Sequence, residues 1–289
     1  QGAGFFLAGT TTARRRAGNE KAEIHWPFAP YPSSVAASNW LGLPNPGDPV
    51  VAQRLAGLER IPGCPVGASV AADPELAGEE RMTALIRGLE AYTEAGADFL
   101  EVNESCPNTG EDPAEESREL EELGRRLERI RQGFLERPDR PPVVVKLSCD
   151  TDPAVVPEVV DRLLDEGFDG VNFGNTSTAY ERRRGAVAAS DRPLYDYFTT
   201  TFGGGVSGRP LKEDSLRLAA AAAEQRERRA PGREFHVVRT GGIEDAADVR
   251  RSLDAGVSLV QWYTGYFQAF AAAGHELYLE LYDELLLAD

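Results

Sequence analysis

Residues 99–110, FLEVNESCPNTG, bring one thiol together with two carboxamides. An apolar run that reads as a buried strand ends at Asn103, and the following loop carries Cys106, Pro107 and Asn108. An exposed, partly ionised thiol acts as a base or a nucleophile. Carboxamides donate and accept hydrogen bonds, which suits a planar heterocycle with alternating N–H and C=O groups. We expect a reactive site here rather than a buried cysteine that serves only as a small apolar side chain.

Lys146 is of chemical interest because the sequence holds only three lysines. It lies in the apolar run VVVKLS, where an unpaired ammonium would be costly to bury, so an anion or an electron-rich group is expected beside it. A strand-end lysine that reaches water is the alternative. Asn175 and Thr176 follow the next apolar run as neutral donors and acceptors, or as ordinary turn residues.

Three glycine-rich turns occur in the C-terminal third of the sequence, two of them at the ends of apolar runs. They are GGGVSGRPLK at 203–212, RTGG at 239–242 and YTG at 263–265. Glycine exposes backbone N–H groups that can bind phosphate. The loops after the last two strands of a TIM barrel frequently bind a phosphate group in this way. Together the three turns predict a phosphorylated cofactor, with Gly208 allowing close approach of the backbone.

Seven short apolar runs read as buried strands, and amphipathic helices lie between most of them. The runs are 4–9, 65–70, 98–103, 142–148, 170–175, 235–242 and 259–265. This alternation indicates right-handed βαβ units and a parallel sheet. Polar residues and glycines gather at the C-terminal ends of nearly all the strands, which favours an α/β fold of the (β/α)8 TIM-barrel type over an open doubly wound sheet. The missing first strand is predicted to precede Gln1.

Two long segments, 10–50 and 176–208, lack helical or strand periodicity. Long segments of this kind in a compact domain are usually functional or disordered. Their prolines, aromatics and glycines suggest ordered covers over the barrel mouth. No repeat or linker is visible, so residues 1–289 are predicted to form a single domain.

The composition narrows the classes of partner. The net charge is −16, from 31 basic and 47 acidic residues, which disfavours nucleic acid and anionic membrane surfaces. No run of 18 apolar residues and no signal-peptide pattern is present, so a soluble, cytoplasmic protein is expected. The three cysteines and three histidines lack CxxC, HxxxH and HExxH spacing, so no metal site is predicted.

Several motifs occur in an order that resembles the dihydroorotate dehydrogenase family. VNESCPNTG is similar to the family's N-x-S-[CS]-P-N loop, GTTTARRRAGN to its G-T-x-T…G-N segment, and NWLGLPNPG to its N-x-x-G-x-x-N-x-G motif. VVVKLS, GNTST, GGVSGRPL, VRTGGI and LVQWYTG match later blocks. The resemblance implies an FMN-binding TIM barrel that oxidises dihydroorotate to orotate in de novo pyrimidine biosynthesis.

The resemblance also implies roles for individual residues. In the family, the loop Cys or Ser takes a proton from C5 of the substrate while a hydride passes from C6 to flavin N5. Cys106 stands at the position of this base, and Lys146 at that of the lysine beside the flavin N1–C2 edge. The implied substrate contacts are Asn39, Asn103, Asn108, Asn175 and Thr176. The implied cofactor contacts are Thr10, Asn103, Lys146, Gly208, Gly241, Gly242, Tyr263, Thr264 and Gly265.

Some positions depart from the family pattern, among them the segment YFQAFAAAG, which stands after YTG in place of a G-P pair. Gly9 stands where members with a cysteine base carry a lysine, and Glu104 occupies a usually apolar position. The arginine clusters at 13–18 and 181–186 are expected to pair with acidic neighbours or with the substrate carboxylate.

Two other functions stay open from the sequence. A dihydrouridine synthase acting on tRNA is opposed by the net charge, because tRNA binding needs a basic face. The second open function is that of a degenerate barrel, which binds a flavin or a phosphate group but does not catalyse a reaction. The electron acceptor, which is fumarate, a quinone or an NAD-linked partner subunit in the family, stays open as well, and so does assembly into a homo-oligomer.

Overall fold

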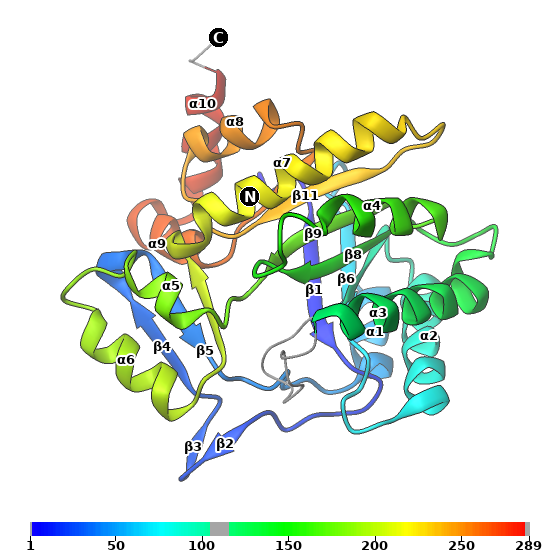
Figure 1. The fold of residues 1–289 in the computed structure, drawn as a ribbon, viewed down its shortest axis with the longest axis horizontal. Helices are drawn as coiled ribbons and strands as arrows, with labels where there is room; N and C mark the ends of the chain where they lie inside the picture. The colour runs from blue at the N-terminus through cyan, green and yellow to red at the C-terminus, as the bar shows by residue number, and fades with distance from the viewer. Residues whose placement is uncertain (1, 105–115, 287–289) are drawn as a thin grey trace.

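The computed structural model describes residues 2–104 and 116–286. Seven strands form a curled main sheet in the order β1-β6-β7-β8-β9-β11-β12, and each neighbouring pair is parallel (Figure 1). These strands correspond to the seven predicted runs, which confirms the parallel α/β architecture. They are β1 Phe6–Thr11, β6 Val66–Val70, β7 Phe99–Asn103, β8 Val143–Ser148, β9 Gly170–Asn175, β11 His236–Thr240 and β12 Leu259–Gln261.

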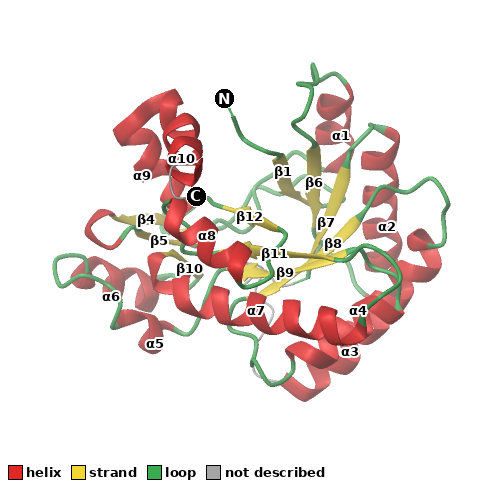
Figure 2. Cartoon of the chain, turned by 90° about the horizontal axis from the view of Figure 1, so that it is seen from above, coloured by secondary structure: helices red, strands yellow, loops and turns green. Residues whose placement is uncertain are grey.

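The main sheet resembles a TIM barrel that is open on one side. Figure 2 shows β1 and β12 at the two edges of the sheet, and in residues 2–104 and 116–286 no eighth strand joins them. The expectation that a first strand precedes Gln1 therefore stays a prediction.

Helices cover the outer face of the main sheet (Figure 1). The predicted helices are confirmed, and α1 is an addition that begins inside the segment 10–50. Pro49 at its first turn fits a helix start, because proline needs no donor there. The helices around the barrel are α1 Asp48–Ala56, α2 Gly78–Glu94, α3 Glu116–Ile130 with a π-helical turn at Arg131–Leu135, α4 Val156–Asp165, α7 Lys212–Arg229, α8 Ala246–Asp254, α9 Thr264–Ala273 and α10 Leu277–Leu286.

Successive residues of each strand point to opposite faces of the sheet. On β7, Leu100 and Val102 join the apolar core beneath the helices, whereas Glu101 and Asn103 alternate with them and belong to the barrel interior. On β8, Val145 and Leu147 likewise lie in the core and Lys146 does not. The apolar core thus lies between sheet and helices, and polar side chains remain for the interior.

The two long segments are ordered, as predicted, but they contain secondary structure that the sequence pattern did not reveal. They meet in an antiparallel sheet of order β10-β5-β4, which Figure 1 shows beside α5 and α6. A second apolar cluster, including Tyr31, Tyr195 and Phe198, packs α6 against this sheet. The elements are β2 Glu20–Lys21, β3 Ile24–His25, β4 Phe28–Tyr31, β5 Ala36–Asn39, α5 Tyr180–Arg184, α6 Arg192–Thr201 and β10 Gly205–Gly208, with 3-10 turns at Pro32–Ser34, Arg209–Leu211 and Gly274–Glu276.

Candidate functional site

Every strand of the main sheet contributes a polar side chain to the barrel interior, and most of these side chains lie in the C-terminal half of their strand. We call this set the interior polar layer. It consists of Thr10, Ser69, Glu101, Asn103, Lys146, Asn172, Thr240 and Gln261. Because the carboxyl ends of barrel strands form the active-site face of this fold, the layer marks the candidate site.

Glu101 is the acceptor at the centre of the interior polar layer. Its side chain is 2% exposed, and both of its oxygens accept hydrogen bonds. The Ser69 hydroxyl donates to Oε1 at 3.0 Å, and the Asn172 amide donates to Oε2 at 3.2 Å. Donors from other strands therefore satisfy a carboxylate that would otherwise be costly to bury.

Lys146 is the cation of this layer. Its Nζ lies 3.7 Å from Oε1 of Glu101, and its side chain is 17% exposed. The anion expected beside Lys146 is thus present and belongs to the neighbouring strand, where Asn103 is paired in register with Lys146. The remaining exposure leaves the ammonium able to face a ligand in the barrel.

The structure brings together three of the predicted substrate residues. The Asn175 amide donates to Asn103 Oδ1 at 3.0 Å, and the Asn103 amide donates to Thr10 Oγ1 at 3.0 Å. The backbone N–H of Thr176 donates to Asn175 Oδ1 at 3.1 Å. Carboxamides at the ends of β7 and β9 are therefore fixed in one orientation at the barrel mouth.

Other predicted residues lie elsewhere. Asn39 ends β5 in the antiparallel sheet, where its amide reaches the Gly205 carbonyl oxygen at 3.5 Å. Cys106 and Asn108 lie outside the described residues, so their roles stay predictions. Tyr263 precedes α9 with 64% of its surface exposed, and its ring meets that of Phe267 edge-on with centroids 5.1 Å apart.

The predicted glycine turns converge in what we call the glycine cradle, made of Gly208, Gly241, Gly242 and Gly265. A Cβ on Gly208 would lie 2.2 Å from the Val35 carbonyl oxygen and 3.0 Å from Thr264 Cγ2. A Cβ on Gly265 would lie 2.2 Å from the carbonyl oxygen of Ile243, in the loop after β11. The backbones of these turns therefore approach neighbouring segments closely.

The glycine cradle fits a phosphate group. Helix α9 begins at Thr264, and no side chain caps its first turn, so backbone N–H groups there remain to bind an anion. Gly241 and Gly242 have φ of 112° and 74°, a region that favours glycine. The residues present therefore offer backbone donors of the kind that bind a phosphate group.

Sequence reasoning missed Ser69, Glu101, Asn172, Thr240 and Gln261. Two of them carried a signal, because Glu101 interrupts the buried run FLEV and Asn172 the buried run GVNF. A polar residue at alternate positions of a buried strand indicates an interior-facing side chain. Asn172 Oδ1 is buried without a hydrogen-bond partner in the described part of the chain, so the interior retains an open acceptor.

Two of the departures from the family pattern have structural explanations. Glu104 is nearly buried and pairs with Arg126 of α3 at 2.6 Å, so its charge is neutralised locally. A Cβ on Gly9 would lie 2.5 Å from the Ser69 carbonyl oxygen, so no side chain fits there without moving β1 from β6.

The arginine clusters pair with acidic neighbours, as expected. In the first cluster, Arg14 contacts Asp73 at 3.0 Å. In the second, the buried Arg183 contacts Asp150 at 2.8 Å and also pairs with Asp214. These arginines stabilise the segments that follow β1 and β9, and their charges are locally compensated.

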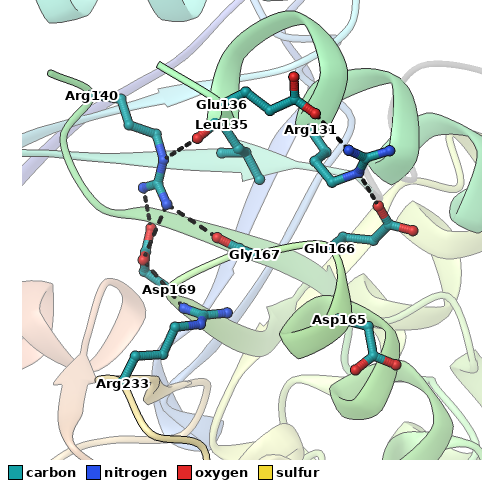
Figure 3. A pocket seen from close by; sticks show the side chains of 9 residues that line it. All are labelled: Arg131, Leu135, Glu136, Arg140, Asp165, Glu166, Gly167, Asp169 and Arg233. Carbon is teal, nitrogen blue, oxygen red and sulfur yellow. Dashed lines mark hydrogen bonds and ion pairs between the residues drawn. The ribbon is translucent and has the colours of Figure 1, made fainter. Parts of the chain in front are cut away.

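A surface hollow of about 380 Å³ lies near the N-terminal ends of β8 and β9, away from the interior polar layer. Figure 3 shows Arg131, Arg140 and Arg233 directed toward Glu136, Glu166 and Asp169. Arg140 pairs with Asp169, and Arg131 donates to Glu166 at 2.8 Å. Since these charges satisfy one another, and this end of a barrel contributes mainly to stability, we do not assign the active site here.

Comparison with known proteins identifies the family. A model described as dihydroorotate dehydrogenase matches residues 1–285. The "Dihydroorotate dehydrogenase (quinone)" of Kineococcus radiotolerans is 35% identical over 267 residues, which cover 89% of this chain and 66% of that protein. The protein of the same name from Halorhodospira halophila is 31% identical over 272 residues, covering 91% of this chain and 71% of that one. The chain thus spans about two thirds of the length of the curated relatives it matches.

The same fold is found in a solved structure. The crystal structure of the Eimeria tenella enzyme DHODH in complex with ferulenol aligns with a TM-score of 0.78 at 23% identity, covering 99% of this chain and 75% of that one. Among residues 2–104 and 116–286, no helix has the length and apolar character needed to cross a membrane. The match over nearly all of its residues shows that this chain belongs to the dihydroorotate dehydrogenase family.

Proposed function

We propose that this protein catalyses the FMN-dependent oxidation of dihydroorotate to orotate in de novo pyrimidine biosynthesis. The observation that carries the proposal is the interior polar layer, in which Lys146 is the cation and the Asn103–Asn175 pair stands at the strand ends. Family membership supports it, and it favours dihydroorotate over the tRNA substrate of a dihydrouridine synthase. We further propose that the described segments belong to a single FMN-binding domain.

In this proposal, the glycine cradle and the interior polar layer would bind different parts of the cofactor. The cradle and the first turn of α9 would hold the phosphate, with Tyr263 and Thr264 beside it. Thr10, Asn103 and Lys146 would contact the flavin ring. Bound FMN would supply an acceptor for the hydride that leaves C6 of the substrate.

The protein's own groups would bind the substrate and move its proton. Asn103, Asn108, Asn175 and Thr176 would hold the ring by paired donors and acceptors, and Asn39 would reach it from the antiparallel sheet. The hydrogen bonds that fix Asn103 and Asn175 in advance lower the cost of orienting the substrate. The Cys106 thiolate would take the proton from C5, as a base held on the loop after β7.

The relatives named above suggest the electron acceptor. Because they are named as quinone-dependent enzymes, we propose that a quinone reoxidises the flavin. We place the protein in the cytoplasm, in keeping with an odd number of cysteines that lack CxxC spacing. We also propose that the protein assembles as a homo-oligomer or with an electron-transfer partner subunit.

The test is anaerobic reduction of the purified protein. Its visible spectrum should show bound flavin, and addition of dihydroorotate should bleach it. Cys106→Ser replaces the thiol by a hydroxyl, which is a weaker acid. Cys106→Ala removes the proposed base altogether. We expect Cys106→Ala to slow bleaching by about 10²- to 10⁴-fold while leaving flavin content unchanged.

The possible results separate the parts of the proposal. A colourless protein that does not take up added FMN would contradict flavin binding. A yellow protein that dithionite bleaches and dihydroorotate does not would contradict the substrate. Equal bleaching rates in the wild type and Cys106→Ala would contradict the role of Cys106 alone.

A further inference from the structure

Glu101 is the carboxylate of the interior polar layer and faces its cation directly. It is almost fully buried in the middle of β7, and Lys146 approaches it from β8. A carboxylate in this position must have a purpose or a compensating partner, because burial of a charge is costly. The family roles assigned above use Lys146 and leave Glu101 without a function.

The contacts of Glu101 hold the carboxylate in one position. Ser69 of β6 donates to one oxygen and Asn172 of β9 to the other, so hydrogen bonds tie the group to two further strands of the main sheet. Asn172 is itself tied to β11 and β12, since its amide also reaches Thr240 at 3.0 Å and Gln261 at 3.2 Å. The carboxylate is therefore a fixed negative charge.

Lys146, in contrast, has a flexible side chain that forms an ion pair with Glu101. A lysine side chain carries about 2 kcal/mol of rotamer entropy, so an ammonium needs a fixed partner to keep one position. Glu101 supplies this partner at 3.7 Å and offsets part of the lysine charge. The Lys146 ammonium thus has a fixed position, and the positive potential that it produces in the barrel interior is reduced by Glu101.

We propose that Glu101 is a positioning residue that fixes Lys146 and moderates its charge, and that it thereby sets the reduction potential of the bound flavin. The inference rests on the proposed function, because it requires FMN beside Lys146. Two-electron reduction adds negative charge to the flavin, so a cation beside it favours the reduced form and a carboxylate that offsets this cation opposes it.

The test is the two-electron midpoint potential of the flavin, measured by reductive titration against a reference dye. Glu101→Gln keeps the size of the side chain and removes its charge. We expect the equilibrium to shift about tenfold toward reduced flavin, which is about 30 mV to more positive potential for a two-electron couple. Lys146→Met should shift it in the opposite direction.

A double variant separates action through Lys146 from direct action. If Glu101 acts through Lys146, adding Glu101→Gln to Lys146→Met should shift the potential much less than Glu101→Gln does in the wild type. The matched control is Glu104→Gln, which removes the same charge from a buried carboxylate that pairs with Arg126 instead. Its effect on the potential should be much smaller than that of Glu101→Gln.

Each result bears on the inference. An unchanged potential in Glu101→Gln, an equal shift in Glu104→Gln, or the same Glu101→Gln shift with and without Lys146 would overturn it. If Glu101→Gln holds no flavin, Glu101→Asp is measured instead, because it keeps the charge but withdraws it from Lys146. A potential in Glu101→Asp equal to that of the wild type would then overturn the inference. A wild type without flavin would contradict the proposed function itself.

Discussion

Asp48 is a buried carboxyl whose titration should make the stability of this protein depend on pH. It is the first residue of α1 and is 2% exposed. In the described part of the chain, neither of its oxygens has a hydrogen-bond partner. Burial raises the pKa of Asp48 to about 6, and the hydroxyls of Thr11 and Tyr92 nearby offset only part of that rise. These hydroxyls hydrogen-bond to each other at 2.7 Å.

The sign and size of the effect follow from this pKa. In the unfolded chain the carboxyl titrates near its ordinary pKa of 3.8, so between that pH and about 6 the folded protein holds a proton that the unfolded chain has lost. Stability therefore falls as the pH rises through this window. A difference of about two pKa units corresponds to about 3 kcal/mol, all of it lost by about pH 7 to 8.

Asp48→Asn should remove this dependence, because the amide is neutral at every pH. Urea unfolding of flavin-saturated protein, measured at intervals from about pH 4.5 to 8, gives the free energy of unfolding of both proteins. The difference between the Asp48→Asn variant and the wild type should move by about 2 to 3 kcal/mol in favour of the variant as the pH rises. A constant offset is also expected, since the buried amide donors cost about 1 to 3 kcal/mol if unpaired.

The slope with pH is therefore the informative quantity, whatever the sign of the offset. Asp139→Asn, at a carboxylate with 71% of its side chain exposed, is the matched control and should give a flat difference. A flat difference for Asp48→Asn as well would refute the reasoning, because it would mean that Asp48 is ionised in the folded protein with an ordinary pKa.

Two further predictions concern the cradle and the segment after β9. Gly242→Ala places a Cβ 2.4 Å from Lys212 Cα at a φ of 74°, so the flavin absorbance per protein should fall. The control is Gly232→Ala, which should leave this absorbance unchanged because no atom lies within 4 Å of the new Cβ. Equal flavin content in the two variants would contradict the role of the glycine cradle. Arg183→Ala removes the buried cation beside Asp150 and should lower the free energy of unfolding by about 3 to 5 kcal/mol, and a loss below about 1 kcal/mol in urea unfolding would count against that pairing.

The main sheet was predictable because each strand is a short, nearly continuous apolar run. Parallel strands covered by helices need such runs, and helices with a regular apolar period lie between them. The antiparallel sheet was not predictable, because β4 and β5 are only four residues long and their partner β10 lies far along the chain. The segment FAPY also contains a proline, which argues locally against a strand.

The candidate site was predictable where a residue type stands out against its surroundings. Lys146 and Asn103 were found because they lie at or near the ends of apolar runs, and the glycine turns because they repeat at strand ends. Asn172 and Gln261 were not found, because a single polar residue inside a short strand does not show which other side chains it meets. Only the register of the sheet shows that their side chains meet in the interior.

The antiparallel sheet has a consequence for the order of folding. Its strands β5 and β10 meet between Asn39 and Gly205, which are 166 residues apart. Closing a free chain of that length costs about 4.5 kcal/mol in the logarithmic part of the loop entropy, against about 0.5 to 1.5 kcal/mol returned by each hydrogen bond of the pairing. Once the main sheet has placed the ends of β1 and β9, only the connections from Thr11 to Ala36 and from Asn175 to Gly205 remain to be closed. We therefore expect the antiparallel sheet to form after the main sheet and to open locally while the main sheet stays folded.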